Sequence, residues 1–303
     1  MDIIKKLAQE LAIKEEQAKA AVQLIDEGNT IPFIARYRKE MTGALNDETL
    51  RNLHERLLYL RNLEEKKEQV INAITDQGKM TEDLKKKILS AETLVAVDDL
   101  YRPYRPKKQT RATKAKEKGL EPLANILLLQ KTTKSMEEEA AAFVNAEKGV
   151  ANAKEAIAGA KDIIAEMIAD MADYRKSIRN CTMKQGSLVV KAKDEKAESV
   201  YEMYYDFREP LSKVTGYRVL AINRGEKEKI LTVKINAPEE EILSWLKRQV
   251  IRTDNPNTTP ILEAVVEDSY KRLIAPAIER EIRNDLTEKA EDGSIKVFGK
   301  NLE

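Results

Sequence analysis

Apolar residues recur at helical spacing through most of this chain. In the stretch from residue 47 to residue 77, Leu50, Leu53, Leu57 and Leu60 lie three or four positions apart. That spacing places side chains on one face of a helix. The pattern therefore predicts one long amphipathic helix over residues 47–77.

The long helix is predicted to pack in a bundle rather than to form a coiled coil. A coiled coil keeps its apolar seam over several heptads, whereas Lys67 stands where the next apolar residue is due. A shorter helix is predicted just before it, over residues 32–41. Thr30 and Pro32 there give the order of a capping residue followed by a proline in the first helical turn.

The periodicity changes after Gly186. Residues 188–190 form a short apolar run, and residues 230–235 alternate apolar and polar side chains in the manner of a strand. Residues 216–225 fit a helix or a strand equally well. The predicted fold class is therefore mainly α, a multi-helix bundle with a small β element near residues 187–235.

The remaining sequence predicts further helices and a division into four segments. One long helical stretch covers residues 152–184, and another helix begins near residue 260 and is expected to kink at Pro276. The apolar pattern continues into the last ten residues, which leads us to expect a further domain after residue 303. The predicted segments are a helical region ending in a basic stretch (1–118), a long-helix region (119–185), a small mixed α/β segment (186–238) and C-terminal helices (239–303).

Composition narrows the chemistry that this chain can perform. With one cysteine, Cys181, and one histidine, His54, it lacks a disulfide framework and any multi-cysteine or multi-histidine metal site. No glycine-rich phosphate loop or hydrolase motif is present. No apolar run of about 18 residues and no signal peptide is found either. We therefore expect a non-enzymatic protein of the cytoplasm, without cofactor, metal or membrane partner.

The overall charge hides one strongly basic stretch. Lys and Arg number 53 against 52 Asp and Glu, yet residues 101–118 hold eight basic residues and one acidic residue. Pro103 and Pro106 favour an extended polyproline II conformation there, with Tyr101 and Tyr104 inward and the cations outward. The candidate phosphate contacts in this stretch are Arg102, Arg105, Lys107, Lys108 and Arg111.

A second basic cluster lies in the predicted helix 32–41, where Ile31, Ile34 and either Tyr37 or Phe33 are expected to face inward. The candidates on its outer side are Arg36, Arg38 and Lys39.

Each cluster also has a purely structural interpretation. The helix can simply present a solvated face, and the stretch 101–118 can be a strap whose arginines pair with acids such as Asp98 and Asp99. Arg224 is expected on a tight turn over residues 223–226, where a structural bridge is favoured over ligand binding. His54 and Cys181 are expected to be a partly exposed histidine and an inert thiol.

Three long motifs resemble one known family. Residues 29–67 (NTIPFIARYRKEMTGALNDETL…), 97–124 (VDDLYRPYRPKKQTRATKAKEK…) and 216–235 (GYRVLAINRGEKEKILTVKI) resemble the N-terminal region of Tex, the bacterial transcription accessory proteins. Gly216 and Tyr217 stand where that family usually has Ser and His. The resemblance implies the N-terminal helical part, with a helix-turn-helix-like region, of a longer nucleic-acid-binding protein. In that family an RNase H-like domain, helix-hairpin-helix repeats and an OB-fold RNA-binding domain follow.

Two functions therefore remain open. The first is a scaffold that adds phosphate contacts, with RNA or DNA bound mainly through domains absent from this chain and the transcription machinery as a further partner. The second is a scaffold for protein partners or for the other domains, with no nucleic-acid binding of its own.

Overall fold

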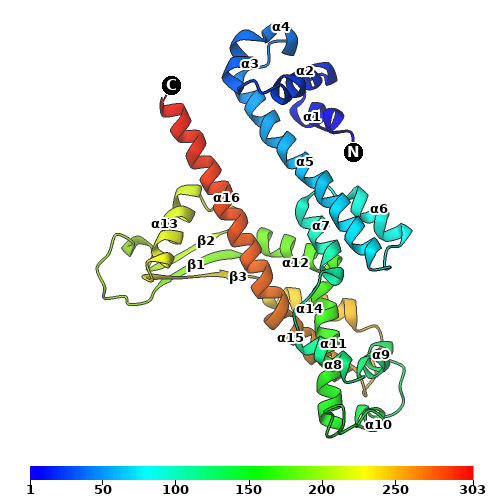
Figure 1. Ribbon diagram of the computed structural model, residues 1–303. Helices are drawn as coiled ribbons and strands as arrows, with labels where there is room; N and C mark the ends of the chain where they lie inside the picture. The colour runs from blue at the N-terminus through cyan, green and yellow to red at the C-terminus, as the bar shows by residue number, and fades with distance from the viewer. Residues whose placement is uncertain (303) are drawn as a thin grey trace. The chain divides into compact units, whose positions relative to one another are not determined.

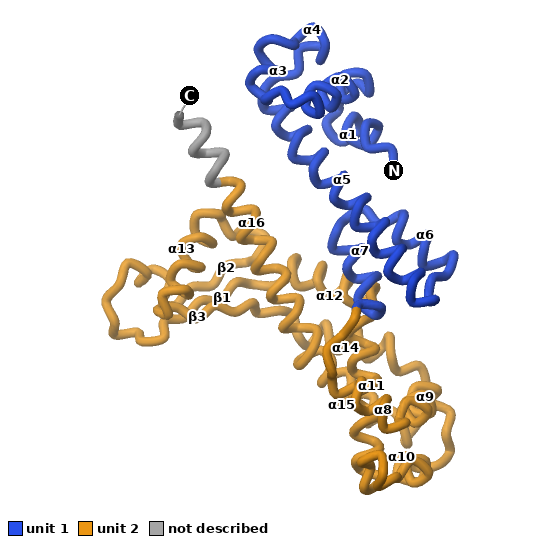
Figure 2. The backbone as a smooth tube through the Cα atoms, in the orientation of Figure 1, with its two compact units in different colours: residues 1–105 blue, residues 106–303 orange. Residues whose placement is uncertain are grey.

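The computed structural model describes the backbone of residues 1–302 and the side chains of residues 1–293. It divides into two compact units, residues 1–105 and residues 106–303, each described by itself below (Figure 2). Most described residues are helical, and a small antiparallel sheet lies in the second unit (Figure 1). The prediction of a mainly α fold with a β element near 187–235 is confirmed. The expected apolar pattern at residues 295–302 lies outside the described side chains.

The first unit is entirely helical. Its helices pack around α5, the long helix predicted from the leucine spacing. The elements are α1 (Ile3–Leu11), α2 (Glu15–Asp26), α3 (Ile31–Tyr37), α4 (Lys39–Thr42), α5 (Asp47–Asp76), α6 (Glu82–Ser90), α7 (Leu94–Tyr101) and a 3₁₀ turn η1 (Arg102–Tyr104).

The segment predicted as a single helix over residues 32–41 is two helices. The Thr30 hydroxyl caps α3 as predicted, accepting a hydrogen bond from the Phe33 N–H at 3.4 Å. Arg38 then leaves helical geometry, with φ −128° and ψ 27°, so α4 begins anew at Lys39. Gly43 ends α4 in the left-handed region, at φ 62°, where a residue without a Cβ is favoured.

Lys67 is part of the core of the first unit. Its side chain continues the buried face of α5, and the residue is only 1% exposed. Its ammonium donates to Glu64 Oε1 at 3.0 Å and to the Leu89 carbonyl oxygen at 2.8 Å. The expectation that Lys67 interrupts the seam is therefore wrong, because pairing lets a lysine occupy a core position.

The extended conformation predicted for residues 101–118 is wrong at both ends of the stretch, whereas residues 105–110 between them lie in no helix and Arg105 is extended, with φ −63° and ψ 134°. The first part forms η1, with Pro103 in its opening turn, where the missing N–H costs nothing. The later part forms the helix α8 (Arg111–Glu117), which Thr110 and Thr113 cap reciprocally. Tyr101 and Tyr104 do pack against the core of the first unit, so their inward orientation was predicted correctly.

The second unit combines helices with a three-stranded sheet. The run predicted as one helix over residues 152–184 is broken at Met171 into α11 and α12. After α8, the elements are α9 (Glu121–Leu129), α10 (Met136–Ala141), α11 (Ala153–Asp170), α12 (Ala172–Gln185), β1 (Ser187–Ala192), a 3₁₀ turn η2 (Glu202–Tyr204), β2 (Asp206–Pro210), α13 (Gly216–Lys227), β3 (Leu231–Asn236), α14 (Glu239–Val250), α15 (Thr259–Asp268), a π-helical turn (Ser269–Ile274) and α16 (Ala275–Leu302).

The sheet has the order β2-β1-β3, and both pairings are antiparallel. Val190 of β1 stands opposite Phe207 of β2 on one side and Val233 of β3 on the other. The sequence predicted β1 and β3 but not β2. Residues 216–225, which fitted two interpretations, lie in the helix α13.

The helix expected to kink at Pro276 is instead interrupted by the π-helical turn, whose last residue lies two positions before that proline. A proline cannot donate a hydrogen bond to the preceding helical turn. Wide turns of this kind commonly accommodate such a break. Within the turn, the Ser269 hydroxyl donates to the Ala165 carbonyl oxygen at 2.6 Å and so ties it to α11.

A buried ion pair joins α12 to α16. Arg175 is fully buried, and its guanidinium lies 2.7 Å from Glu281 Oε1. Arg179 lies 2.8 Å from the other oxygen of the same carboxylate. Burial acts to raise the pKa of Glu281, but the two guanidinium groups outweigh it, so the pKa lies below its ordinary value.

The ion pair predicts a pH-dependent loss of stability in Glu281→Gln. At neutral pH we expect a loss of about 2 kcal/mol, below the roughly 3–5 of a fully buried pair, because Glu281 keeps 35% side-chain exposure. A lowered folded-state pKa stabilises above the ordinary value of 4.5 and stops doing so as pH falls through the folded value. Urea unfolding of both proteins between pH 3 and pH 7 should therefore show the difference shrinking below pH 4.5. A constant difference would contradict the assignment.

Gly225 lies in α13 where the core leaves no room for a larger side chain. A Cβ there would lie 2.5 Å from Leu231 Cδ1 and 3.2 Å from Tyr201 Cδ1, inside the core. We expect Gly225→Ala to cost about 1–3 kcal/mol through overpacking. Gly293→Ala in α16 is the matched control, since a Cβ there meets nothing within 4 Å and alanine favours helix. Thermal unfolding of both variants checks this, and equal melting temperatures would be the contrary result.

Candidate nucleic-acid interface

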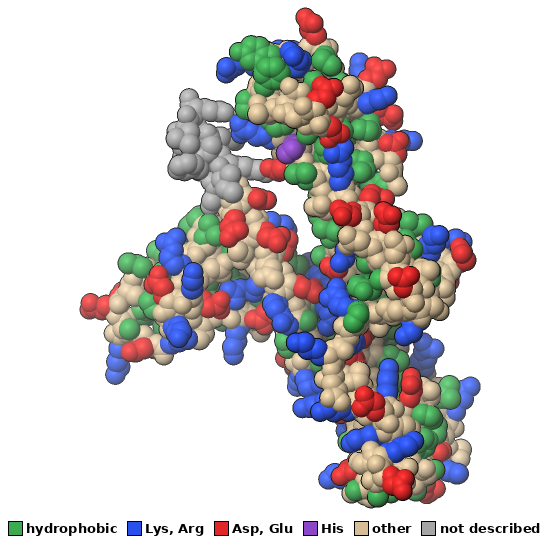
Figure 3. Space-filling model, viewed as in Figure 1, with side chains coloured by type: hydrophobic (Ala, Val, Ile, Leu, Met, Phe, Trp, Pro, Cys, Tyr) green, Lys and Arg blue, Asp and Glu red, His purple; other side chains and the backbone are tan. Residues whose placement is uncertain are grey.

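The cations of the first cluster lie at α3 and α4, where basic and apolar side chains gather on the face shown in Figure 3. Arg36 and Lys39 are exposed, and neither side chain has a hydrogen bond or ion pair with another described residue. Arg38 is partly exposed and is held in place: its guanidinium donates to the Tyr37 carbonyl oxygen at 3.0 Å and lies 4.9 Å from the centroid of the Phe33 ring. Two of the three candidates are thus available to a ligand.

Two aromatic rings stand beside these cations. Phe33 and Tyr37 are four residues apart on α3, and their ring centroids lie 5.3 Å apart. Tyr37 is 60% exposed and Phe33 is partly exposed, and neither ring packs against the core of the first unit, so the expected inward orientation is found at Ile31 and Ile34 only. The four-residue spacing of the two aromatics was the sequence signal for a shared face. The cluster therefore combines exposed positive charge with an exposed ring.

Arg102 and Arg105 belong to the first unit. Arg105 Nη2 lies 3.4 Å from Asp98 Oδ1, and its guanidinium lies 5.6 Å from the centroid of the Tyr101 ring. Both side chains of the ion pair are about half exposed, so the pair is weak and accessible to competing ions. The expectation that this stretch pairs with Asp98 is met at Arg105.

The second unit contains the other three candidate cations of the basic stretch, Lys107, Lys108 and Arg111. One of them, Lys107, is held in ion pairs. The Lys107 ammonium lies 2.9 Å from Glu166 Oε1 and is also paired with Asp170, both on α11 and both largely buried. Lys108 and Arg111 are exposed. Lys107 therefore fastens the start of this unit to α11.

Arg111 stands close to a second pair of acids, Asp162 on α11 and Asp268 at the end of α15. Burial raises the pKa of Asp162, although the charges of Arg272 and Arg111 act in the opposite direction. At Asp268 the hydrogen bond from Arg272 lowers the pKa, and Arg111 adds to that effect. Arg111 is thus exposed, but the two nearby acids partly offset its charge.

We find no catalytic group among the described residues at the other three positions considered, Arg224, His54 and Cys181. Arg224 is exposed in the last turn of α13, so the predicted tight turn over residues 223–226 is wrong. His54 is partly exposed, and its Nδ1 is buried without a hydrogen-bond partner. Burial and the charge of Glu241 raise the pKa of the Cys181 thiol, which keeps it protonated and unreactive.

Two kinds of site are not found in the described part of the chain. Its residues include no group of three or more His, Cys, Asp or Glu side chains placed to hold a metal ion. None of its helices combines the length and apolar character needed to cross a membrane.

Two protein families match this chain. The Tex-like protein N-terminal domain matches residues 1–75, and the Tex central region-like family matches residues 131–298. The chain belongs to the Tex family. The second match covers more than half of its length, and it includes all three strands of the sheet.

Similar proteins extend the Tex assignment over the whole chain. It is 45% identical over 299 residues to the uncharacterized protein YdcI of Bacillus subtilis, a match covering 98% of this chain and 42% of YdcI. It is 37% identical over 310 residues to the transcriptional accessory protein Tex of Neisseria gonorrhoeae, covering all of this chain and 40% of that protein. It is also 33% identical over 317 residues to human S1 RNA-binding domain-containing protein 1, covering 99% and 32%.

The chain therefore spans about two fifths or less of the length of these relatives. Their names associate the family with transcription and, in the human protein, with an RNA-binding domain. The Neisseria gonorrhoeae relative is named an accessory protein.

The Lys107 contacts predict different consequences for two neighbouring lysines. Lys107→Ala should lower the free energy of unfolding by about 1 kcal/mol, because two largely buried acids lose their partner. The loss should be smaller in 1 M salt, where the acids are screened. Lys108→Ala, which removes an exposed side chain without a partner, should leave stability unchanged. Urea titrations at low and high salt distinguish the two, and equal effects would argue against the structural role of Lys107.

Proposed function

We propose that this chain is a non-catalytic module of a cytoplasmic nucleic-acid-binding transcription accessory protein, to which it contributes a scaffold and phosphate contacts. One observation carries the proposal: Arg36 and Lys39 are exposed and unpaired among the described residues, beside the exposed ring of Tyr37. Membership of the Tex family supports the same role.

The physical basis is counterion release. Each lysine or arginine that neutralises a phosphate frees a condensed cation from the nucleic acid, which favours binding regardless of base sequence. An unpaired cation such as Arg36 or Lys39 gives this gain without first breaking an ion pair. The Tyr37 ring can add stacking against an unpaired base.

The connection between α2 and α3 supports a helix-turn-helix-like role for this end of the unit. Four residues, 27–30, join the two helices, and Gly28 among them has φ 89°. A short turn containing glycine is typical of that motif, whose second helix contacts the nucleic acid. In this chain α3 would be that second helix, and it carries Arg36.

The cations of the basic stretch 101–118 differ in how available they are for phosphate contact. Lys108 and Arg111 are exposed and remain candidates for phosphate contact, as does Arg102. Arg105 would have to leave Asp98, which costs little because that pair is half exposed. Lys107 would have to leave two acids of α11, so we assign it a structural role.

The same ion pairs support a second candidate function, that of a scaffold that binds no nucleic acid itself. The pairing of Arg105 with Asp98 and of Lys107 with Glu166 is what a scaffold without nucleic-acid binding would show. On that view the exposed cations of α3 and α4 are a solvated surface or dock an acidic protein partner.

The double charge reversal Arg36→Glu with Lys39→Glu tests the proposal. We expect weaker binding to both single-stranded RNA and duplex DNA, and a slope of log K against log salt that falls by about two, one for each cation. Fluorescence anisotropy between 25 and 200 mM salt measures both quantities. The matched control is Lys85→Glu with Lys86→Glu, which makes the same charge change on exposed positions of α6.

The control separates a local contact from the general effect of net charge. If both double variants lose affinity equally, the cluster at α3 and α4 is not the contact surface. If the unaltered chain binds neither nucleic acid at 25 mM salt, the scaffold function replaces the proposed one.

A further inference from the structure

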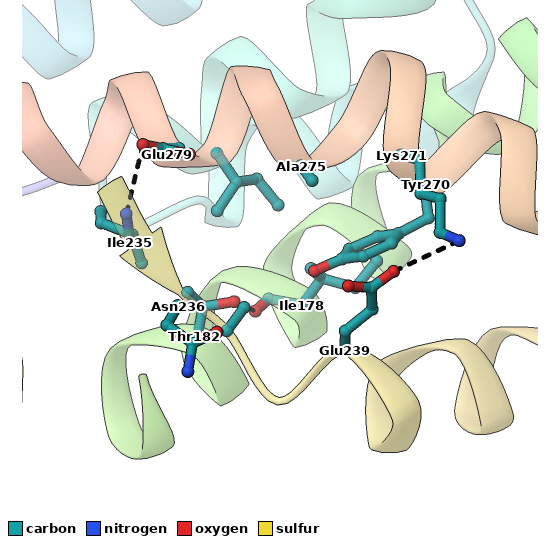
Figure 4. Close-up of a pocket in the computed structure, with 11 residues that line it drawn as sticks. Ile178, Thr182, Ile235, Asn236, Glu239, Tyr270, Lys271, Ala275 and Glu279 are labelled. Carbon is teal, nitrogen blue, oxygen red and sulfur yellow. Dashed lines mark hydrogen bonds and ion pairs between the residues drawn. The ribbon is translucent and has the colours of Figure 1, made fainter. Parts of the chain in front are cut away.

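A pocket of about 250 Å³ lies within the second unit, where several elements converge (Figure 4). Its walls are α12, the end of β3, the start of α14, the π-helical turn and the start of α16. At roughly 30 Å³ per water molecule it has room for about eight waters. It is smaller than the roughly 300–1,000 Å³ of drug-sized sites, so a small molecule would fill it.

Tyr270 on the π-helical turn has a largely buried side chain that presents its hydroxyl to this pocket. The residue is 4% exposed, yet its hydroxyl has no hydrogen-bond partner among the described residues. The hydroxyl itself is open to the pocket, so water or a ligand there can reach it. Figure 4 shows its ring reaching across the pocket toward the side of Thr182 and Asn236. A ligand in the pocket would supply the missing partner.

The phenol stays protonated throughout the physiological range. Burial raises the pKa of Tyr270 to about 12, and the negative charges of Glu239 and Glu279 act in the same direction. The neutral hydroxyl can accept a hydrogen bond from a ligand and can donate one in return. The same two acids show that the field at the pocket is negative.

The charged groups of the pocket favour a cation over an anion. Glu279 uses Oε1 to accept the Ile235 N–H at 3.2 Å and has no ion pair with a described residue. Glu239 lies 3.6 Å from the Lys271 ammonium, and both of these side chains are more than half exposed. Lys271 thus offsets one carboxylate only weakly and leaves the other uncompensated.

The rest of the lining combines the polar residues Thr182 and Asn236 with apolar side chains. Ile178 from α12, Ile235 from β3, and Ala275 and Ile278 from α16 supply hydrocarbon surface next to the polar groups. A ligand with a short aliphatic stem and a cationic end would match both parts. The π-helical turn is the element that makes room for it, since wide turns of this kind occur often at functional sites.

We propose that this pocket binds a small organic cation, an ammonium or guanidinium group on a short aliphatic stem. The stem lies against Ile178 and Ile278, and the cationic end donates to the Glu279 carboxylate and to the Tyr270 hydroxyl. This site is separate from the proposed nucleic-acid surface, and its test does not depend on that function.

The test titrates the full 303-residue chain with four probes that share one stem: n-butylguanidinium, n-butylammonium, n-butanol and butyrate. Methyl NMR spectra report where each probe binds. We expect the two cations to shift the methyl signals of Ile178, Ile235 and Ile278, and the neutral and anionic probes to bind at least about tenfold more weakly, the loss of one charge-assisted hydrogen bond.

Two substitutions and a control assign the contacts. Glu279→Gln keeps the acceptor for the Ile235 N–H but removes the charge, and should weaken cation binding about tenfold. Tyr270→Phe removes a hydroxyl without a partner, so it should weaken binding about three- to tenfold while leaving the melting temperature unchanged. Glu263→Gln makes the same change on an exposed face of α15 and should alter neither.

The proposal is overturned by any of three results. These are cation binding that moves no methyl signal of the pocket, equal binding of butyrate, and unchanged affinity in Tyr270→Phe. A large drop in the melting temperature of Tyr270→Phe would show instead that the phenol is part of the folded framework. If Glu279→Gln does not fold, the Tyr270→Phe affinity alone decides.

Discussion

A basic side chain that leaves water must find an anion or a carbonyl, because an unpaired buried charge costs several kcal/mol. This chain meets that requirement at two positions in particular. Lys67 enters the core of the first unit by donating to Glu64 and to the Leu89 carbonyl. Arg175 is fully buried in the second unit against Glu281. A protein in which 35% of the residues are charged can therefore bury some of those side chains in its cores, which a count of apolar residues alone would not predict.

The same requirement sorts the exposed cations by what they can do. Lys107 is committed to Glu166 and Asp170, and Arg105 loosely to Asp98, so part of the basic stretch is occupied within the fold. Arg36 and Lys39 carry no such commitment among the described residues. We therefore propose nucleic-acid contact at α3 and α4 because the cations there are unpaired, and not because positive charge is densest there.

The pocket of the second unit presents a different case, a largely buried tyrosine whose hydroxyl faces a cavity without a protein partner among the described residues. Its walls include α12 and α16, the two helices that the Arg175–Glu281 pair holds together. The fixed spacing of these helices and the wide turn before α16 keep the cavity open beneath Tyr270. Two kinds of site, one electropositive and one electronegative, thus follow from where charges are paired and where they are not.

Local patterns in the amino-acid order were enough to predict the long helix α5, the Thr30 cap, the strand β3 and the family. Leucine spacing, Thr30 and the alternation at residues 230–235 act between near neighbours, so the printed order of residues is enough to predict them. Contacts between distant parts of the chain decide that Lys67 is buried, that β2 joins the sheet and that Tyr270 faces a cavity. Each of these depends on a partner distant in sequence, since desolvation and strand pairing are set by what the folded chain brings alongside.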